Sequence, residues 1–143
     1  MPDNDIGKVK TQIEKEIKQL AKNTEQDCKT AKSLCEQEAE LAKNKEPSGE
    51  AKKRAVDLRK ALQDLEKTYL AKANSTSARI GDILKTSVPD DKQTWPEWQK
   101  GMDKWYRELL DKEAGLDIGK GLKLTGEISI KDKKALIKLN GKF

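Results

Sequence analysis

The chain has 143 residues, of which 38% are charged and 34% are apolar, and its formal net charge is +5. Only 28 residues are Leu, Ile, Val or Phe, which is too little material for the large core of a compact enzyme. The chain contains no His and so lacks the commonest general base and zinc ligand; we expect no catalytic site, no metal and no cofactor.

The first residues are polar and acidic and do not have the basic and apolar regions of a signal peptide. No stretch is apolar enough to span a membrane, so we expect a soluble chain that is cytoplasmic or exported without a cleaved leader. Cys28 and Cys35 are seven residues apart, which on a helix is about 10 Å and beyond disulfide reach. We expect both to be small buried residues in a reducing compartment.

Residues 6–42 have an apolar pattern with an eleven-residue period, and because neither Pro nor Gly interrupts residues 8–46, we expect a helix at about 6–46. Such a period corresponds to about 3.67 residues per turn, which favours a nearly straight packing seam. The pattern predicts one long helix. Its seam comprises Ile6, Val9, Ile13, Ile17, Leu20, Thr24, Cys28, Ala31, Cys35, Ala39 and Ala42.

Pro47, Ser48 and Gly49 end this helix, and a second apolar stretch with the same eleven-residue period predicts another helix at 50–87. The run 74–77 is poor helix material and is a weak point of this helix, but the apolar pattern continues through it, so the sequence still predicts one continuous element. Folding the chain about Pro47 makes neighbours of residues whose numbers sum to about 95, and large side chains then oppose small ones near the tip. The sequence therefore predicts an antiparallel helical hairpin.

Residues 94–97 have the pattern of a capping box with Pro just inside the helix start. They predict a third helix at 95–114, with Gly115 as its C-cap. All three Trp lie in this helix, and its apolar stripe comprises Trp95, Met102, Trp105 and Leu109. We therefore expect Trp98 and Tyr106, which lie beside the stripe, to be partly exposed.

Beyond residue 115 the apolar period changes to two. Alternation over 121–130 and 135–142 predicts a β-hairpin with one apolar face. A two-stranded ribbon is marginal in water on its own, so it must rest on the third helix or pair with another chain. The last strand also offers an unprotected edge that is able to extend a partner's sheet.

The expected fold class is α+β and mainly α, with a long antiparallel coiled-coil hairpin, a Trp-rich third helix and a C-terminal β-hairpin. We divide the chain into the hairpin, 1–88, and the third helix with the ribbon, 89–143, which together form one continuous structural unit.

The need of the ribbon for a covering surface predicts a non-enzymatic protein–protein interaction module, such as an adaptor, a chaperone-like protein or an assembly component. The third helix and the ribbon would dock another protein, or a second copy of the chain in a homo-oligomer. The candidate contact residues are Trp98, Tyr106, Ile137, Leu139 and Phe143.

A basic cluster near the hairpin tip supports an alternative, a nucleic-acid-binding protein that contacts phosphates. The cluster comprises Lys52, Lys53, Arg54, Arg59 and Lys60. A net charge of +5 is ordinary for a solvated, lysine-rich surface, and no recognisable nucleic-acid-binding motif accompanies the cluster. A third alternative is a leaderless secreted toxin or effector acting on membranes, but the charged turn of the ribbon argues against it.

Overall fold

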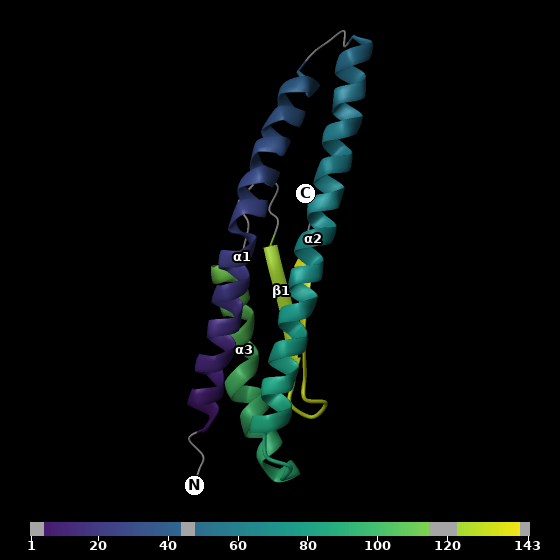
Figure 1. Ribbon diagram of the computed structural model, residues 1–143. Helices are drawn as coiled ribbons and strands as arrows, with labels where there is room; N and C mark the ends of the chain where they lie inside the picture. The colour runs from purple at the N-terminus through teal and green to yellow at the C-terminus, as the bar shows by residue number, and fades with distance from the viewer. Residues whose placement is uncertain (1–4, 44–47, 115–122, 141–143) are drawn as a thin grey trace.

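The computed structural model describes residues 5–43, 48–114 and 123–140. Helices α1 (Asp5–Ala42) and α2 (Gly49–Ser87) run side by side along an elongated molecule (Figure 1). A 3₁₀ turn at Lys92–Thr94 leads into α3 (Trp95–Ala114), and the antiparallel strands β1 (Lys123–Ser129) and β2 (Lys134–Asn140) follow. The predicted fold class is therefore confirmed. The expected C-cap at Gly115 and the outer ends of both predicted strands lie outside the described residues.

Polar contacts across the hairpin set the register of α1 against α2. In each contact a basic side chain of α2 donates to an oxygen on α1, over distances between 2.5 and 2.8 Å. The pairs are Glu16–Arg79, Asp27–Lys72 and Gln37–Arg54. Their residue numbers sum to 95, 99 and 91, which confirms the predicted fold-back about Pro47.

The predicted seam of α1 is buried at most of its positions from Val9 to Cys35, but Ala39 and Ala42 are exposed. The expectation that the seam continues to Ala42 is therefore wrong. Alanine side chains bury little apolar surface, so they stabilise contact between the last turns only weakly.

Helix α2 runs unbroken through residues 74–77, which confirms the prediction of one continuous element. Thr76 and Ser77 are buried, and the Ser77 hydroxyl donates to the Ala73 carbonyl at 3.0 Å. The same hydroxyl accepts a hydrogen bond from the Ile137 N–H of β2 at 3.0 Å. Tertiary contact thus stabilises a stretch whose intrinsic helix propensity is low.

The five main elements enclose one core. Helix α1 contacts α2 and α3, α2 contacts β2, β2 pairs with β1, and β1 contacts α3, so the elements form a closed ring in cross-section. Every element contributes buried side chains to this core, each stabilising the fold by about 1.5–3 kcal/mol. Examples, one from each element, are Ile17, Ile80, Met102, Leu124 and Ile137.

The start of α3 differs from the predicted capping box. The Asp91 side chain accepts a hydrogen bond from the Gln93 N–H at 3.0 Å, and so caps the 3₁₀ turn. The Thr94 hydroxyl donates to the Asp91 carbonyl at 2.8 Å, and the Thr94 N–H is bonded to that carbonyl at 3.0 Å. Because the Thr94 N–H is used in this turn, it is not the partner of Glu97 that a capping box requires.

Helix α3 and the β-hairpin lie beside only one half of the helical hairpin (Figure 1). We call this half, with α3, β1 and β2, the body. The other half, residues 29–43 of α1 and 49–67 of α2, projects beyond it and is called the tip arm.

The turn between β1 and β2 rests on the connection between α2 and α3. Lys133 adopts a positive φ of 52°, and its Nζ donates to Asp90 Oδ1 at 2.7 Å. The hydrogen bond and the charge of Lys133 lower the pKa of the Asp90 carboxyl from its ordinary value of 3.8.

This contact gives a prediction for pH dependence. Because the folded-state pKa of Asp90 is lowered, the contact contributes stability above the ordinary Asp pKa and loses it as the pH falls through the lowered value. Lys133→Gln should return the pKa of Asp90 to the ordinary range, as measured by an NMR titration of its carboxyl carbon. An Asp90 pKa that is unchanged by this substitution would show that the turn does not rest on this connection.

Candidate functional site

Three of the five candidate contact residues at the ribbon end are buried within the chain itself. Trp98 is 5% exposed, Ile137 is 2% exposed and Tyr106 is fully buried. The expectation that Trp98 and Tyr106 are partly exposed is therefore wrong. Leu139 is half-buried, and Phe143 lies outside the described residues.

The burial of Trp98 and Tyr106 follows from the position of α3 between α1 and β1. A helix with neighbours on two sides buries a wider stripe than one side alone would bury. The buried stripe comprises Trp98, Met102, Tyr106, Leu109 and Leu110. Trp95 and Trp105 lie on its flanks and are half-buried, and Lys10 Nζ lies 5.8 Å from the centre of the Trp105 ring.

Side chains of the helices bind the outer edges of the β-hairpin. Gln99 of α3 pairs with β1 like another strand: its Nε2 donates to the Ile128 carbonyl at 2.7 Å, and its Oε1 accepts from the Ile130 N–H at 2.8 Å. On the other edge, Ser77 of α2 accepts from the Ile137 N–H. The expectation that the last strand has an unprotected edge is therefore wrong for the described part of this strand, because α2 covers that edge.

Neither Gln99 nor Ser77 was a candidate from the sequence, because a polar residue on a helix is typical of the surface. The only signal was the uncharged run 74–77, which contains Ser77.

The Gln99 contact gives a second prediction. Gln99→Leu keeps the size of the side chain but leaves the Ile128 carbonyl and the Ile130 N–H without their partner, so it should cost about 2 kcal/mol of unfolding free energy. Urea unfolding followed by circular dichroism measures the loss. Gln12→Leu, at an exposed position of α1, is the control and should change stability by no more than about 0.5 kcal/mol. Equal effects of the two substitutions would contradict the edge contact.

The five residues of the predicted basic cluster do not act alike. Arg54 donates to Gln37 at 2.8 Å, and Arg59 lies 3.5 Å from Glu38, so both connect α2 to α1. The remaining members, Lys52, Lys53 and Lys60, are exposed and form no ion pair with any residue in the described part of the chain.

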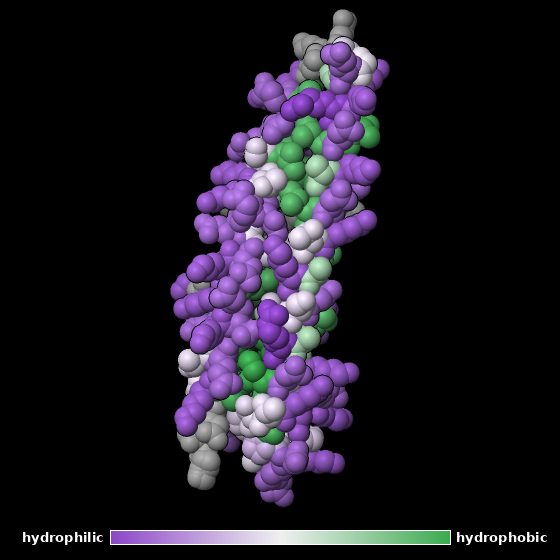
Figure 2. All heavy atoms as spheres, viewed as in Figure 1, coloured by the Kyte–Doolittle hydropathy of each residue, from purple (hydrophilic) through white to green (hydrophobic). Residues whose placement is uncertain are grey.

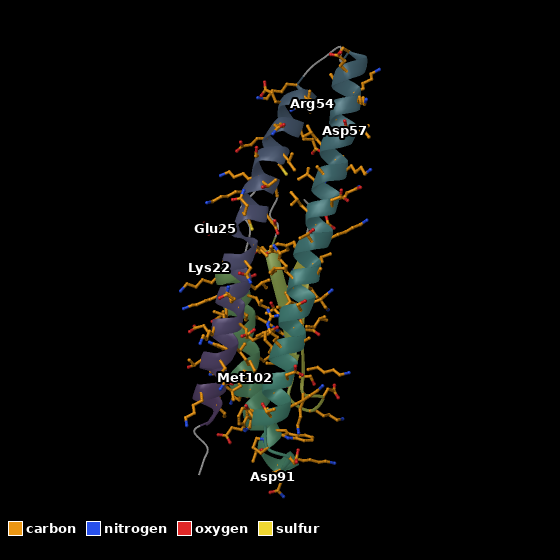
Figure 3. The ribbon with its side chains drawn as sticks, viewed as in Figure 1. Lys22, Glu25, Arg54, Asp57, Asp91 and Met102 are labelled. Atoms are coloured by element: carbon orange, nitrogen blue, oxygen red, sulfur yellow. The ribbon has the colours of Figure 1, made fainter. Side chains whose placement is uncertain are left out.

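A groove of about 400 Å³ opens beside the cluster on the tip arm. It is lined by Glu50, Lys53, Arg54, Asp57 and Leu58. Figure 3 shows Arg54 and Asp57 on the tip arm, far from Asp91 at the opposite end of the molecule. The mixture of acidic and basic side chains makes this groove a poor cradle for a polyanion.

Apolar side chains are also accessible on the tip arm. Figure 2 shows them along the junction of α1 and α2 in this half, whereas charged side chains cross the junction lower down. Leu34, Leu41 and Leu65 are half-buried, and Val56 is 68% exposed. Val56 is the most exposed of the large apolar residues in the described ranges, and it lies outside the apolar seam that the sequence predicts for α2.

A small polar cluster of Thr24, Cys28 and Tyr69 lies in the hairpin seam where the body meets the tip arm. Burial raises the pKa of the Cys28 thiol, a shift that its hydrogen bond with Thr24 opposes. Burial also raises the pKa of Tyr69. A thiol with a raised pKa is a weak nucleophile, so this cluster is better suited to packing than to catalysis. Both cysteines are free thiols.

Two other kinds of site are absent from the residues that the structure describes. These residues contain no group of three or more His, Cys, Asp or Glu arranged to hold a metal ion. No helix among them has the length and apolarity needed to cross a membrane.

The comparisons with known proteins give no relative. No protein-family model matches the sequence. No curated protein matches it, and no solved structure matches the fold.

Proposed function

We propose that this chain is a non-enzymatic protein–protein interaction module, an adaptor or assembly component, that presents its tip arm to a partner. The proposal is supported mainly by a difference between the two halves of the helical hairpin in what packs against them. One half is enclosed in a five-element body, while the other half projects as two helices with accessible apolar side chains. A stable body with a projecting arm is suited to presenting a helical surface at a distance.

The ribbon end is less suited to docking than the sequence indicated. Its candidate residues Trp98, Tyr106 and Ile137 pack inside the body, and its strand edges are bound by Gln99 and Ser77. The covering surface that the ribbon requires is therefore supplied by α2 and α3 of the same chain.

The eleven-residue period allows a direct test. Deleting residues 30–40 from α1 and 55–65 from α2 removes one period from each helix, so the seam should stay in phase. The shortened chain should keep the near-ultraviolet circular dichroism of the body, since all three Trp lie in α3. Both chains are then used as baits for affinity capture. The full chain should retain proteins that the shortened chain does not retain. Identical captured sets on a folded shortened chain would contradict the proposal.

A further inference from the structure

The outward face of α2 carries a regular basic stripe along the tip arm and onto the first turn of the body. Lys53, Lys60 and Lys67 recur every seven residues, so they are stacked about 10 Å apart on one side of the helix. All three are exposed, and none forms an ion pair with a residue that the structure describes.

Each of these lysines is followed, three residues later, by another residue on the same face of the helix. These residues are Val56, Gln63 and Leu70. Val56 is 68% exposed, and Leu70 is half-buried. Positions that alternate at spacings of three and four residues form the face with which one helix packs against another, and charged residues on such a face help to select the partner.

We propose that this stripe, Lys53, Val56, Lys60, Gln63, Lys67 and Leu70, docks an acidic amphipathic helix of a partner protein. The inference deepens the proposed function and rests on it. Carboxylates of the partner would face the three lysines, and its apolar side chains would cover Val56 and Leu70. The seven-residue spacing of the lysines matches the repeat of a second helix packed alongside.

A nucleic acid fits this stripe less well. Glu50, Asp57 and Asp64 also recur every seven residues on the adjacent strip of α2, where they would repel a continuous phosphate backbone. Phosphates would also gain nothing from the exposed Val56. Discrete carboxylates on a helix, in contrast, are able to meet the lysines and avoid the acidic strip.

The chain supplies its own control for bulk charge. Lys8, Lys15 and Lys22 of α1 are likewise exposed and spaced by seven residues. The residues three positions further on are Thr11, Lys18 and Glu25, so this stripe has no apolar seam. Figure 3 shows Lys22 on the side of α1 that faces away from α2.

The test uses a labelled synthetic helix of three heptads, with Glu placed to face the three lysines and Leu placed to cover Val56 and Leu70, and measures binding by fluorescence anisotropy. Reversing three charges with K53E, K60E and K67E should weaken binding at least tenfold. The matched K8E, K15E and K22E variant should bind like the unmodified chain. V56E should weaken binding several-fold while leaving the fold intact, since Val56 is exposed.

Equal weakening by the two triple variants would overturn the inference, because binding would then follow bulk charge. Absence of peptide binding, or tighter binding of a short DNA duplex through the same lysines, would also overturn it. The charge-reversed chain is used as a third bait in the capture experiment. If it retains the proteins that the shortened chain loses, the stripe is not the docking surface but the proposed function stands.

Discussion

Gly126→Ala should destabilise the protein by about 3 kcal/mol or more, at the upper end of the usual cost of overpacking. Gly126 lies on the buried face of β1, opposite Ile137 of β2. A Cβ atom there would clash with the Leu136 carbonyl oxygen and would lie 2.6 Å from Leu110 Cδ1. The carbonyl belongs to the paired strand, so it is unable to move away without disrupting the β-hairpin. Urea unfolding of the variant measures the loss.

Two further variants test the cause of this loss. Leu110→Ala, added to Gly126→Ala, should not restore stability, because it leaves the clash with the backbone of β2 in place. Gly7→Ala places its Cβ in open space within α1, so it should leave stability unchanged or raise it by up to about 1 kcal/mol. A Gly126→Ala chain as stable as the original would show that β1 and β2 do not pair with this register.

Tyr106→Ala should cost about 3–5 kcal/mol of unfolding free energy, because it removes a fully buried aromatic side chain. Tyr106 packs over the sheet at Gly126, where its Cε1 would be 3.1 Å from an added Cβ. Its hydroxyl lies 3.5 Å from the Leu136 carbonyl, at the limit of a hydrogen bond. Burial also raises the pKa of Tyr106.

Tyr106→Phe keeps the ring and should cost no more than about 1 kcal/mol. The two variants separate a core role from the surface role that the sequence indicated. A residue on a docking surface would weaken partner binding when replaced by Ala and leave stability nearly unchanged. Thermal unfolding that is identical for the Ala variant and the unmodified chain would therefore contradict the burial of Tyr106.

The helices were accessible to sequence analysis because their apolar periods are long and uninterrupted. The bounds of α3, at residues 95 and 114, agree with the prediction, and α2 agrees within one residue. The register of the hairpin followed from Pro47 and from matching large side chains to small ones. The alternating face of the β-hairpin also agrees, with Leu124, Gly126, Ile128, Ala135 and Ile137 among the residues that face inward.

The rotation of α3 about its own axis, which decides the side chains that it buries, could not be predicted from the sequence in this way. Apolar residues on this helix cover more than one stripe, and the choice among them depends on how many neighbours the helix has. Trp98 and Tyr106 became buried because β1 packs on α3 from a side that the sequence left open. The periodicity of a single helix carries no information about that neighbour.

The contacts of Gln99 and Ser77 could not be predicted from the sequence for a related reason. Each side chain bonds to a strand edge about 30 or 60 residues away along the chain, and neither residue type signals such a contact. Val56 was missed because it lies outside the eleven-residue seam of α2. The regular lysines beside it looked like ordinary surface charge.

Hydrogen exchange of individual backbone amides tests the division into body and tip arm most directly. The Ile130 and Ile137 amides bond to Gln99 and Ser77 rather than to the partner strand. We expect both to be protected along with the body portions of α1 and α2, and the amides of 29–43 and 49–67 to exchange faster. Rapid exchange at Ile130 and Ile137, or uniform protection along the whole hairpin, would contradict this account.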